Sequence, residues 1–245
     1  MAKGKFSQDL DSLLNQLGPI SNAEIVDQLT RIRDRLVELN RKRLVKINHS
    51  VMQVLCARHL IEQGYDVVCE HPLIGGQLIA DLFAVRDREP ELEHDIENVM
   101  ISERLGLPVE KEALVVEIET GYVPPKAALY PTRYRQTRNA AKIARYCRYS
   151  HRFALATPNY HVLQIPEILI KPPELRDMDG IRQIKKDCDL FYTSPPIPLD
   201  AFTISEIDHI YVINVDHASV TQIPPHEYLD TILRAQGLLS HQFKS

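Results

Sequence analysis

Residues 77–85 read QLIADLFAV, and residues 113–121 read ALVVEIETG. Both stretches are mostly apolar and contain β-branched residues, which predicts two buried β-strands. Asp81 interrupts the first stretch, and Glu117 and Glu119 interrupt the second. Burying a carboxylate is costly unless a cation or hydrogen bonds compensate for it. The three acids therefore indicate that these strands carry more than a hydrophobic core.

A metal site is the first interpretation of these acids. If the two strands pair, Asp81 and Glu117 converge, and Mg²⁺ (or Mn²⁺) would balance their charges. Strand alternation puts Glu119 on the same face as Glu117. We expect the Asp81 and Glu117 carboxylates to lie within about 6 Å of each other, a spacing that one or two metal ions can bridge. The alternative is a solvated sheet face on which acids gather without any function.

The neighbouring elements follow from periodicity and from chain breakers. Apolar residues recur at helical spacing over 48–64, and a short strand is predicted over 65–69. A turn is expected at His71-Pro72, before the Asp81 strand. Beyond the Glu117 strand we expect a helix over 132–149 and a strand over 153–157. The predicted order is α-β-β-β-α-β.

This order, with Asp81 on the second strand and Glu117-Ile118-Glu119 on the third, resembles the PD-(D/E)xK nuclease superfamily over roughly 48–158. That superfamily includes restriction endonucleases and archaeal Holliday junction resolvases. The resemblance implies an α/β fold with a restriction-endonuclease-like αβββαβ core, a mixed central sheet and Mg²⁺-dependent DNA cleavage. It also implies that Asp81, Glu117 and the Ile118 carbonyl ligate the metal. Glu119 stands where most members have lysine, giving E-x-E in place of E-x-K, although some restriction enzymes have glutamate there.

Glu119 would then take a different catalytic part from lysine. It can ligate a second metal ion or accept a proton from the attacking water. Lys126, just after the third strand, is one source of the missing positive charge, and a solvated loop lysine is the alternative.

The helix predicted over 132–149 is strongly basic. No Asp or Glu occurs from Thr120 to Pro166, whereas acids dominate residues 87–119. At about 100° per residue the basic residues form a stripe that we expect to contact DNA phosphates, unless it is merely a solvated face. The expected nucleic-acid contacts are Arg133, Arg135, Arg138, Lys142 and Arg145. Gln136 is expected to enter the catalytic site, because several nucleases of this superfamily place a polar residue of this helix there.

Three regions are predicted along the chain: an N-terminal helical region (1–46), a nuclease-like core (47–166) and a C-terminal α/β extension (167–245). The first contains two helices split at Gly18-Pro19, and its apolar stripe either packs on its own domain or forms a homodimer interface. A helical insertion is expected over 90–106. We expect the extension to continue the core sheet, with a helix over 174–187, a strand over 209–215 and a last helix over 226–236.

Composition narrows the class of protein. The 245 residues are 44% hydrophobic and 25% charged, with a net charge of -4, which is typical of a soluble globular protein. The sequence has no apolar run of roughly 18 residues and no signal peptide, so we expect a cytoplasmic protein without membrane contact. The four cysteines show no C-x-x-C spacing, which argues against zinc ribbons and iron–sulfur clusters.

These features together predict a Mg²⁺-dependent DNA endonuclease or a related phosphodiesterase acting on DNA. One alternative is a catalytically inactive nucleic-acid-binding protein of the same fold. Another is a structural or assembly protein acting through its N-terminal helices. His49, at the start of the first core helix, occupies a position where related enzymes sometimes have a polar site residue, although a helix-start or core histidine is the simpler reading.

Overall fold

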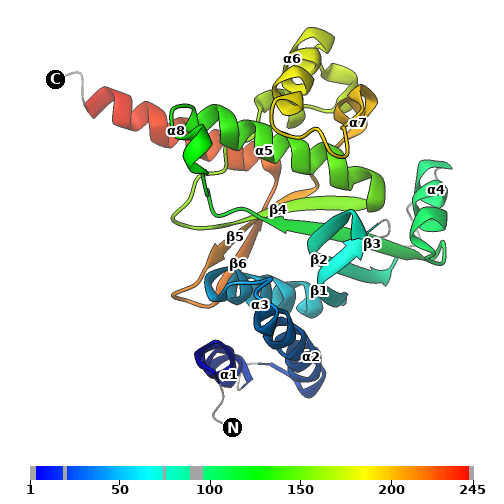
Figure 1. Ribbon diagram of the computed structural model, residues 1–245, viewed down its shortest axis with the longest axis vertical. Helices are drawn as coiled ribbons and strands as arrows, with labels where there is room; N and C mark the ends of the chain where they lie inside the picture. Colours follow the sequence, from blue (N-terminus) through cyan, green and yellow to red (C-terminus); the bar gives the residue numbers. More distant parts are fainter. Residues whose placement is uncertain (1–3, 19–20, 74–75, 89–95, 243–245) are drawn as a thin grey trace.

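The computed structural model describes residues 4–18, 21–73, 76–88 and 96–242 (Figure 1). It is an α/β protein built on a six-stranded sheet in which the strand order follows the chain. The strands are β1 (Asp66–Leu73), β2 (Leu78–Asp87), β3 (Lys111–Ile118), β4 (Arg152–Pro158), β5 (His209–Asn214) and β6 (Ser219–Ile223). The prediction of an α/β fold with a mixed central sheet is confirmed.

The pairing pattern divides the sheet into an antiparallel and a parallel part. Strands β1, β2 and β3 form an antiparallel meander. Strand β4 lies parallel to β3, and β5 lies parallel to β4. Strand β6 then returns antiparallel to β5. Strands β5 and β6, from the C-terminal extension, therefore continue the same sheet.

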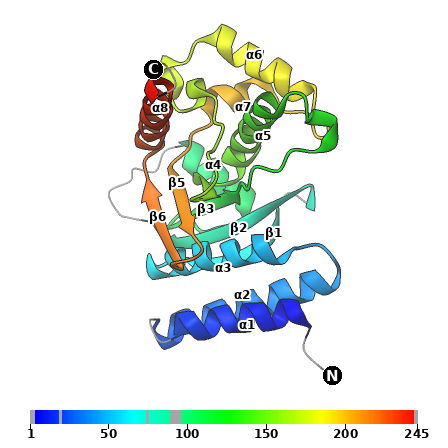
Figure 2. The same ribbon diagram turned by 90° about the vertical axis from the view of Figure 1, so that its left-hand side faces the viewer.

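Helices cover both faces of the sheet (Figures 1 and 2). On one side lie α1 (Lys5–Leu17), α2 (Ala23–Arg41) and α3 (Ile47–Glu62); on the other lie α5 (Pro131–Tyr146), α6 (Met178–Asp189) and α7 (Leu199–Ile204). Helix α4 (Ile96–Leu105) precedes β3, and α8 (Pro225–Gln242) follows β6. We call the two groups of helices the α3 layer and the α5 layer. Successive residues of β3 point to opposite faces of the sheet, so that Leu114 and Val116 pack into the α3 layer, and Ala113 and Val115 pack into the α5 layer.

The N-terminal helices bury their apolar residues within the chain. Leu29, Ile32 and Leu36 of α2 are all at most 3% exposed and belong to the same core cluster as α3. The apolar stripe of α2 is thus used to cover the protein's own sheet. Among the described residues, no helix combines the length and the apolar character that crossing a membrane requires.

Several predicted boundaries are wrong. His71 and Pro72 lie inside β1 rather than in a turn; β1 is an edge strand, where a proline removes no ladder bond that the sheet needs. The helix expected over 174–187 is shifted to α6, after a short 3₁₀ helix at Pro173–Leu175. Helix α7 and strand β6 have no counterpart among the predicted elements. Of the insertion expected over 90–106, residues 90–95 lie outside the described residues.

Candidate functional site

Strands β2 and β3 separate at the two acids that the sequence singles out. Their regular pairing ends at Leu82 and Val116, so Asp81 and Glu117 are the next residues in this register. The Ile118 backbone N–H donates to Asp81 Oδ2 (2.7 Å), and the Asp81 backbone N–H donates to Glu117 Oε1 (3.0 Å). Each carboxylate therefore accepts a backbone N–H that would bond to a carbonyl in a regular ladder. These two hydrogen bonds hold the carboxylates side by side where the strands separate.

An unusual backbone conformation lies across from Asp81. The β1–β2 pairing passes from Cys69–Leu82 to His71–Ala80 and skips Glu70 and Asp81, and Glu70 has a φ of 48°, in the left-handed region that glutamate rarely adopts. Arg35 of α2 stabilises this backbone by donating from Nε to the Cys69 carbonyl and from Nη2 to the Glu70 carbonyl, both at 2.8 Å.

The β1–β2 hairpin bends at this point, which places Asp81 between the two helical layers. Leu82 packs into the α3 layer, whereas Ala80 packs into the α5 layer. His49 Nε2, from α3, is 3.0 Å from Asp81 Oδ1. Lys142 Nζ, from α5, is 4.0 Å from Asp81 Oδ2. One carboxylate thus joins groups delivered from opposite sides of the sheet.

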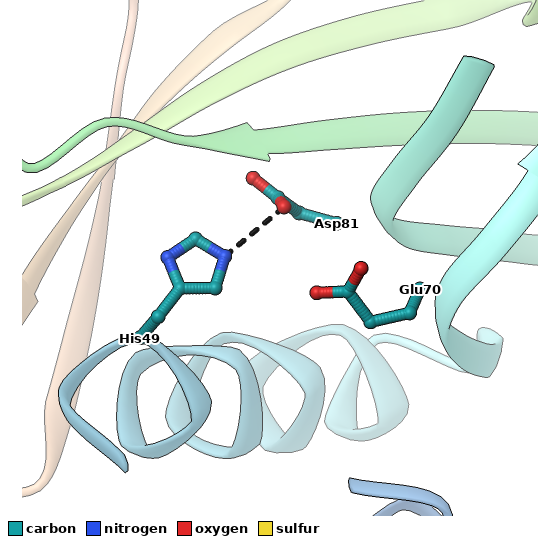
Figure 3. Close-up of side chains that lie close together, drawn as sticks. All are labelled: His49, Glu70 and Asp81. Carbon is teal, nitrogen blue, oxygen red and sulfur yellow. Dashed lines mark hydrogen bonds and ion pairs between the residues drawn. The ribbon is translucent and has the colours of Figure 1, made fainter. Parts of the chain in front are cut away.

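His49, Glu70 and Asp81 lie close enough together for one ligand atom of each to reach the same metal ion (Figure 3). One ligand atom from each lies within 4.8 Å of the other two. Gln53 holds the group by donating from Nε2 to Glu70 Oε1 (2.8 Å) and to the Asp81 carbonyl (3.1 Å). Carboxylate oxygens suit Mg²⁺ and Mn²⁺, and an imidazole nitrogen suits transition metals. The donor set therefore fits a divalent cation.

Lys142 of α5 forms ion pairs with the two remaining acids, Glu117 and Glu119. Its ammonium lies 2.9 Å from Glu117 Oε2 and 2.5 Å from Glu119 Oε1. Arg138, one helical turn earlier in α5, contacts the same Glu119 oxygen at 2.7 Å. The Glu117 and Glu119 side chains are only 4% and 5% exposed. Helix α5 thus brings two positive charges to Glu117 and Glu119.

The surroundings set the protonation of these groups. Burial raises the pKa of Glu117 to about 7, and the neighbouring Asp81 charge adds to this. Burial also acts to raise the pKa of Asp81, but His49 and Lys142 outweigh it and hold that pKa below its usual range. The pKa of Glu119 is likewise lowered, because Lys142 outweighs the effect of burial. Although burial opposes its charge, the pKa of Lys142 is raised by the surrounding carboxylates, so the ammonium stays charged whichever way Glu117 titrates.

The five basic residues of α5 that are expected to contact DNA all have partners within the chain, so they do not form a merely solvated face. Arg138 and Lys142 turn toward the carboxylates, and the other three basic residues have partners within the chain. Arg133 pairs with Asp187, Arg135 donates to the Gly121 carbonyl and Arg145 donates to the Pro195 carbonyl. Helical spacing correctly grouped these residues on α5, but it carried no information about what packs against them.

The expectation that Gln136 enters the site is wrong. Gln136 is exposed and lies about 200° around α5 from Arg138, which faces Glu119. Lys126 is exposed in the short 3₁₀ helix Pro125–Ala127. The carbonyl of Ile118, expected as a metal ligand, faces the Lys142 ammonium at 3.4 Å.

Three residues of the site carried little or no signal in the sequence. Gln53 lies four residues after His49 on α3 and is fully buried among apolar neighbours, a pattern that marks a polar role on a core face. Glu70 has no such signal, because its position depends on the bend in the hairpin. The spacing of Lys142 on its helix predicts a DNA contact, whereas the structure places its ammonium against Glu117 and Glu119.

The shifted pKa of Glu117 predicts a pH-dependent stability in metal-free buffer. Between its ordinary pKa of 4.5 and the folded value of about 7, the unfolded chain releases a proton that the folded protein retains, so stability falls as the pH rises. The raised pKa of His49 acts in the same direction, because the stability it contributes below 6.5 is lost as the pH rises through its folded pKa. Glu117→Gln should therefore gain stability relative to wild type, by about 2–3 kcal/mol between about pH 5 and about pH 8. Urea unfolding with EDTA at both pH values measures this difference, and a constant difference would contradict the assignment.

No family model, no curated protein and no solved structure matches this chain.

Proposed function

We propose that this protein is a metal-dependent nuclease with a restriction-endonuclease-like core, and that it hydrolyses phosphodiester bonds in DNA with Mg²⁺ or Mn²⁺. The observation that carries the proposal is the grouping of Asp81, Glu117 and Glu119 with the Lys142 ammonium where β2 and β3 separate. Carboxylates that hold metal ions and a nearby cation are the groups that phosphodiester hydrolysis requires.

The residues divide this work between them. Asp81 would hold the ion, with Glu117 and the Ile118 carbonyl on one side or with His49 and Glu70 on the other. When bound, the ion would lower the pKa of water and offset charge on the phosphate. Lys142 would stabilise the negative charge that builds on the phosphate oxygens, and Glu119 would position that ammonium through their 2.5 Å contact.

DNA as the substrate is supported by the charge of the chain around the site. Residues 120–166 contain no acid and include α5 and the loops beyond β3 and β4. Lys126 is exposed in this segment, and an exposed cation attracts phosphates irrespective of the base sequence. The resemblance of the element order and of the E-x-E motif to PD-(D/E)xK nucleases points to the same substrate.

One observation favours a catalytically inactive nucleic-acid-binding protein instead. Lys142 and Arg138 already neutralise Glu117 and Glu119, so these acids have less need of a metal ion. An assembly role through the N-terminal helices receives less support, because the apolar stripe of α2 is buried within the chain.

Cleavage assays separate these functions. We expect the wild-type protein to cut duplex, branched or single-stranded DNA with Mg²⁺ or Mn²⁺, and EDTA to abolish the cutting. Inert wild-type protein that still binds DNA in a salt-dependent way would reject the nuclease and favour the inactive binding protein. Inert protein without DNA affinity would reject both.

Glu119→Gln should lower the cleavage rate by about 10- to 100-fold, the range typical of partners that position a reacting group. The amide removes the charge that holds Lys142 and Arg138 in place. DNA binding should stay equal or tighten, because a negative charge near the phosphate is lost. Glu174→Gln, which changes an exposed acid of a 3₁₀ helix, is the matched control. Undiminished cleavage in Glu119→Gln would show that Glu119 takes no part.

A further inference from the structure

We propose that Tyr122, Tyr130 and Tyr160 form a platform on which the bases of an unpaired nucleic-acid strand stack beside the carboxylate site. The inference rests on the proposed function and adds the substrate class: single-stranded DNA, or a flap or end with unpaired bases, in preference to continuous duplex. We call these three side chains the tyrosine platform.

Each tyrosine lies in a segment that leaves the candidate site. Tyr122 comes three residues after Glu119, in the segment that follows β3, and Tyr160 comes two residues after Pro158, the last residue of β4. Because β3 and β4 are parallel neighbours, both segments begin at the same end of the sheet, where the two strands have their carboxyl ends. Tyr130 immediately precedes α5, the helix that carries Arg138 and Lys142.

Direct contacts join the three segments. Gly121 has a φ of +78°, and a Cβ added to it would fall 2.4 Å from His161 Cε1, so the loop after β3 packs closely on the loop after β4. Arg135, in the second turn of α5, donates from Nε to the Gly121 carbonyl at 3.2 Å. Tyr122 and Tyr160, which adjoin Gly121 and His161 in the chain, are therefore brought close together, and the first two turns of α5, which Tyr130 precedes, lie beside them.

Their exposure sets these tyrosines apart. Tyr122 is 63%, Tyr130 61% and Tyr160 75% exposed. Among the described side chains, every other tyrosine and every phenylalanine is at least partly buried, so the exposed tyrosine rings are these three. Leu129, 85% exposed, adds apolar surface beside Tyr130. Large apolar side chains grouped on a surface mark a binding site more often than chance exposure does.

The chemistry of the platform fits an unpaired strand. Aromatic rings stack on base faces, which a duplex hides within its own stack but a single strand presents. The surrounding chain supplies phosphate contacts, because no acid occurs over 120–166 and Lys126 is exposed between Tyr122 and Tyr130. Rings that bind bases next to cations that bind phosphates are the pattern of single-strand binding surfaces.

Binding in EDTA tests the platform without any cleavage. Fluorescence anisotropy would compare labelled oligothymidine with a hairpin duplex, using full-length wild type and Tyr122→Ala, Tyr130→Ala and Tyr160→Ala. We expect wild type to prefer the single strand and each alanine to weaken single-strand binding about 5-fold or more, while the matching phenylalanine variants, which keep the ring, retain it. Ile96→Ala, which removes an exposed apolar side chain from α4, is the control and should bind as wild type does.

The outcomes separate this inference from the proposed nuclease. Equal affinity for duplex and single strand, or alanine variants that bind normally, would overturn the platform even if the protein cleaves DNA. Single-strand binding that depends on the tyrosines, in a protein inert with Mg²⁺ and Mn²⁺, would keep the platform and reject the nuclease. Equal binding of oligouridine would extend the ligand to RNA within the same chemistry, and competition by polyglutamate would show a different acidic ligand and overturn the inference.

Discussion

Replacing Lys142 by methionine is expected to lower the free energy of unfolding by about 3–5 kcal/mol, the cost of leaving buried charges without their partner. Lys142 lies against Glu117 and Glu119, and these two glutamate side chains are almost completely buried. Methionine keeps much of the volume of the lysine stem but removes the charge, so packing changes little while the acids lose their cation. Urea unfolding at neutral pH measures the loss.

Two further variants show whether charge is the cause. Lys126→Met, on an exposed lysine, should change stability by no more than about 0.5 kcal/mol. Adding Glu117→Gln to Lys142→Met should recover part of the stability, because one uncompensated carboxylate is then gone. If Lys142→Met unfolds at the same urea concentration as wild type, the ammonium does not hold the site together.

Asp81→Asn is expected to reduce metal-dependent cleavage by about 10³-fold or more, which corresponds to the several kcal/mol that a bound metal ion supplies to the transition state. Asp81 is central because it faces Glu117, His49 and Lys142 at once. The asparagine side chain keeps an oxygen that can accept from the Ile118 N–H, so the opening between β2 and β3 should persist. Initial rates of plasmid nicking with Mg²⁺ and with Mn²⁺ measure the effect.

The control is chosen to separate lost chemistry from lost structure. Asp179→Asn changes an exposed acid in the first turn of α6 and should leave nicking unchanged. Circular dichroism and urea unfolding should show that Asp81→Asn is folded. If a folded Asp81→Asn protein nicks at the wild-type rate, Asp81 is not a metal ligand, and the proposed catalytic site around it is wrong.

The sequence alone determined the local part of this site. The two-residue spacing of Glu117 and Glu119 on a predicted strand specified that they share a face, and the structure places both against α5. The order of elements around Asp81 and Glu117 agrees with the observed α3, β1, β2, β3, α5 and β4, because each is a short segment with its own period and its own breakers.

Tertiary structure decided which groups meet the acids. Lys142 lies 23 residues beyond Glu119 in the chain, and helical spacing defines the face of α5 on which it lies but not what packs on that face. His49 reaches Asp81 only because the β1–β2 hairpin bends at Glu70, a glutamate in the left-handed region that Arg35 of α2 stabilises. Residues far apart in the chain thus create the electrostatics of the site, and a local pattern carries no information about such contacts. The sequence therefore determined where the carboxylates lie along their strands, and the packing of α3 and α5 on the two faces of the sheet decided their partners.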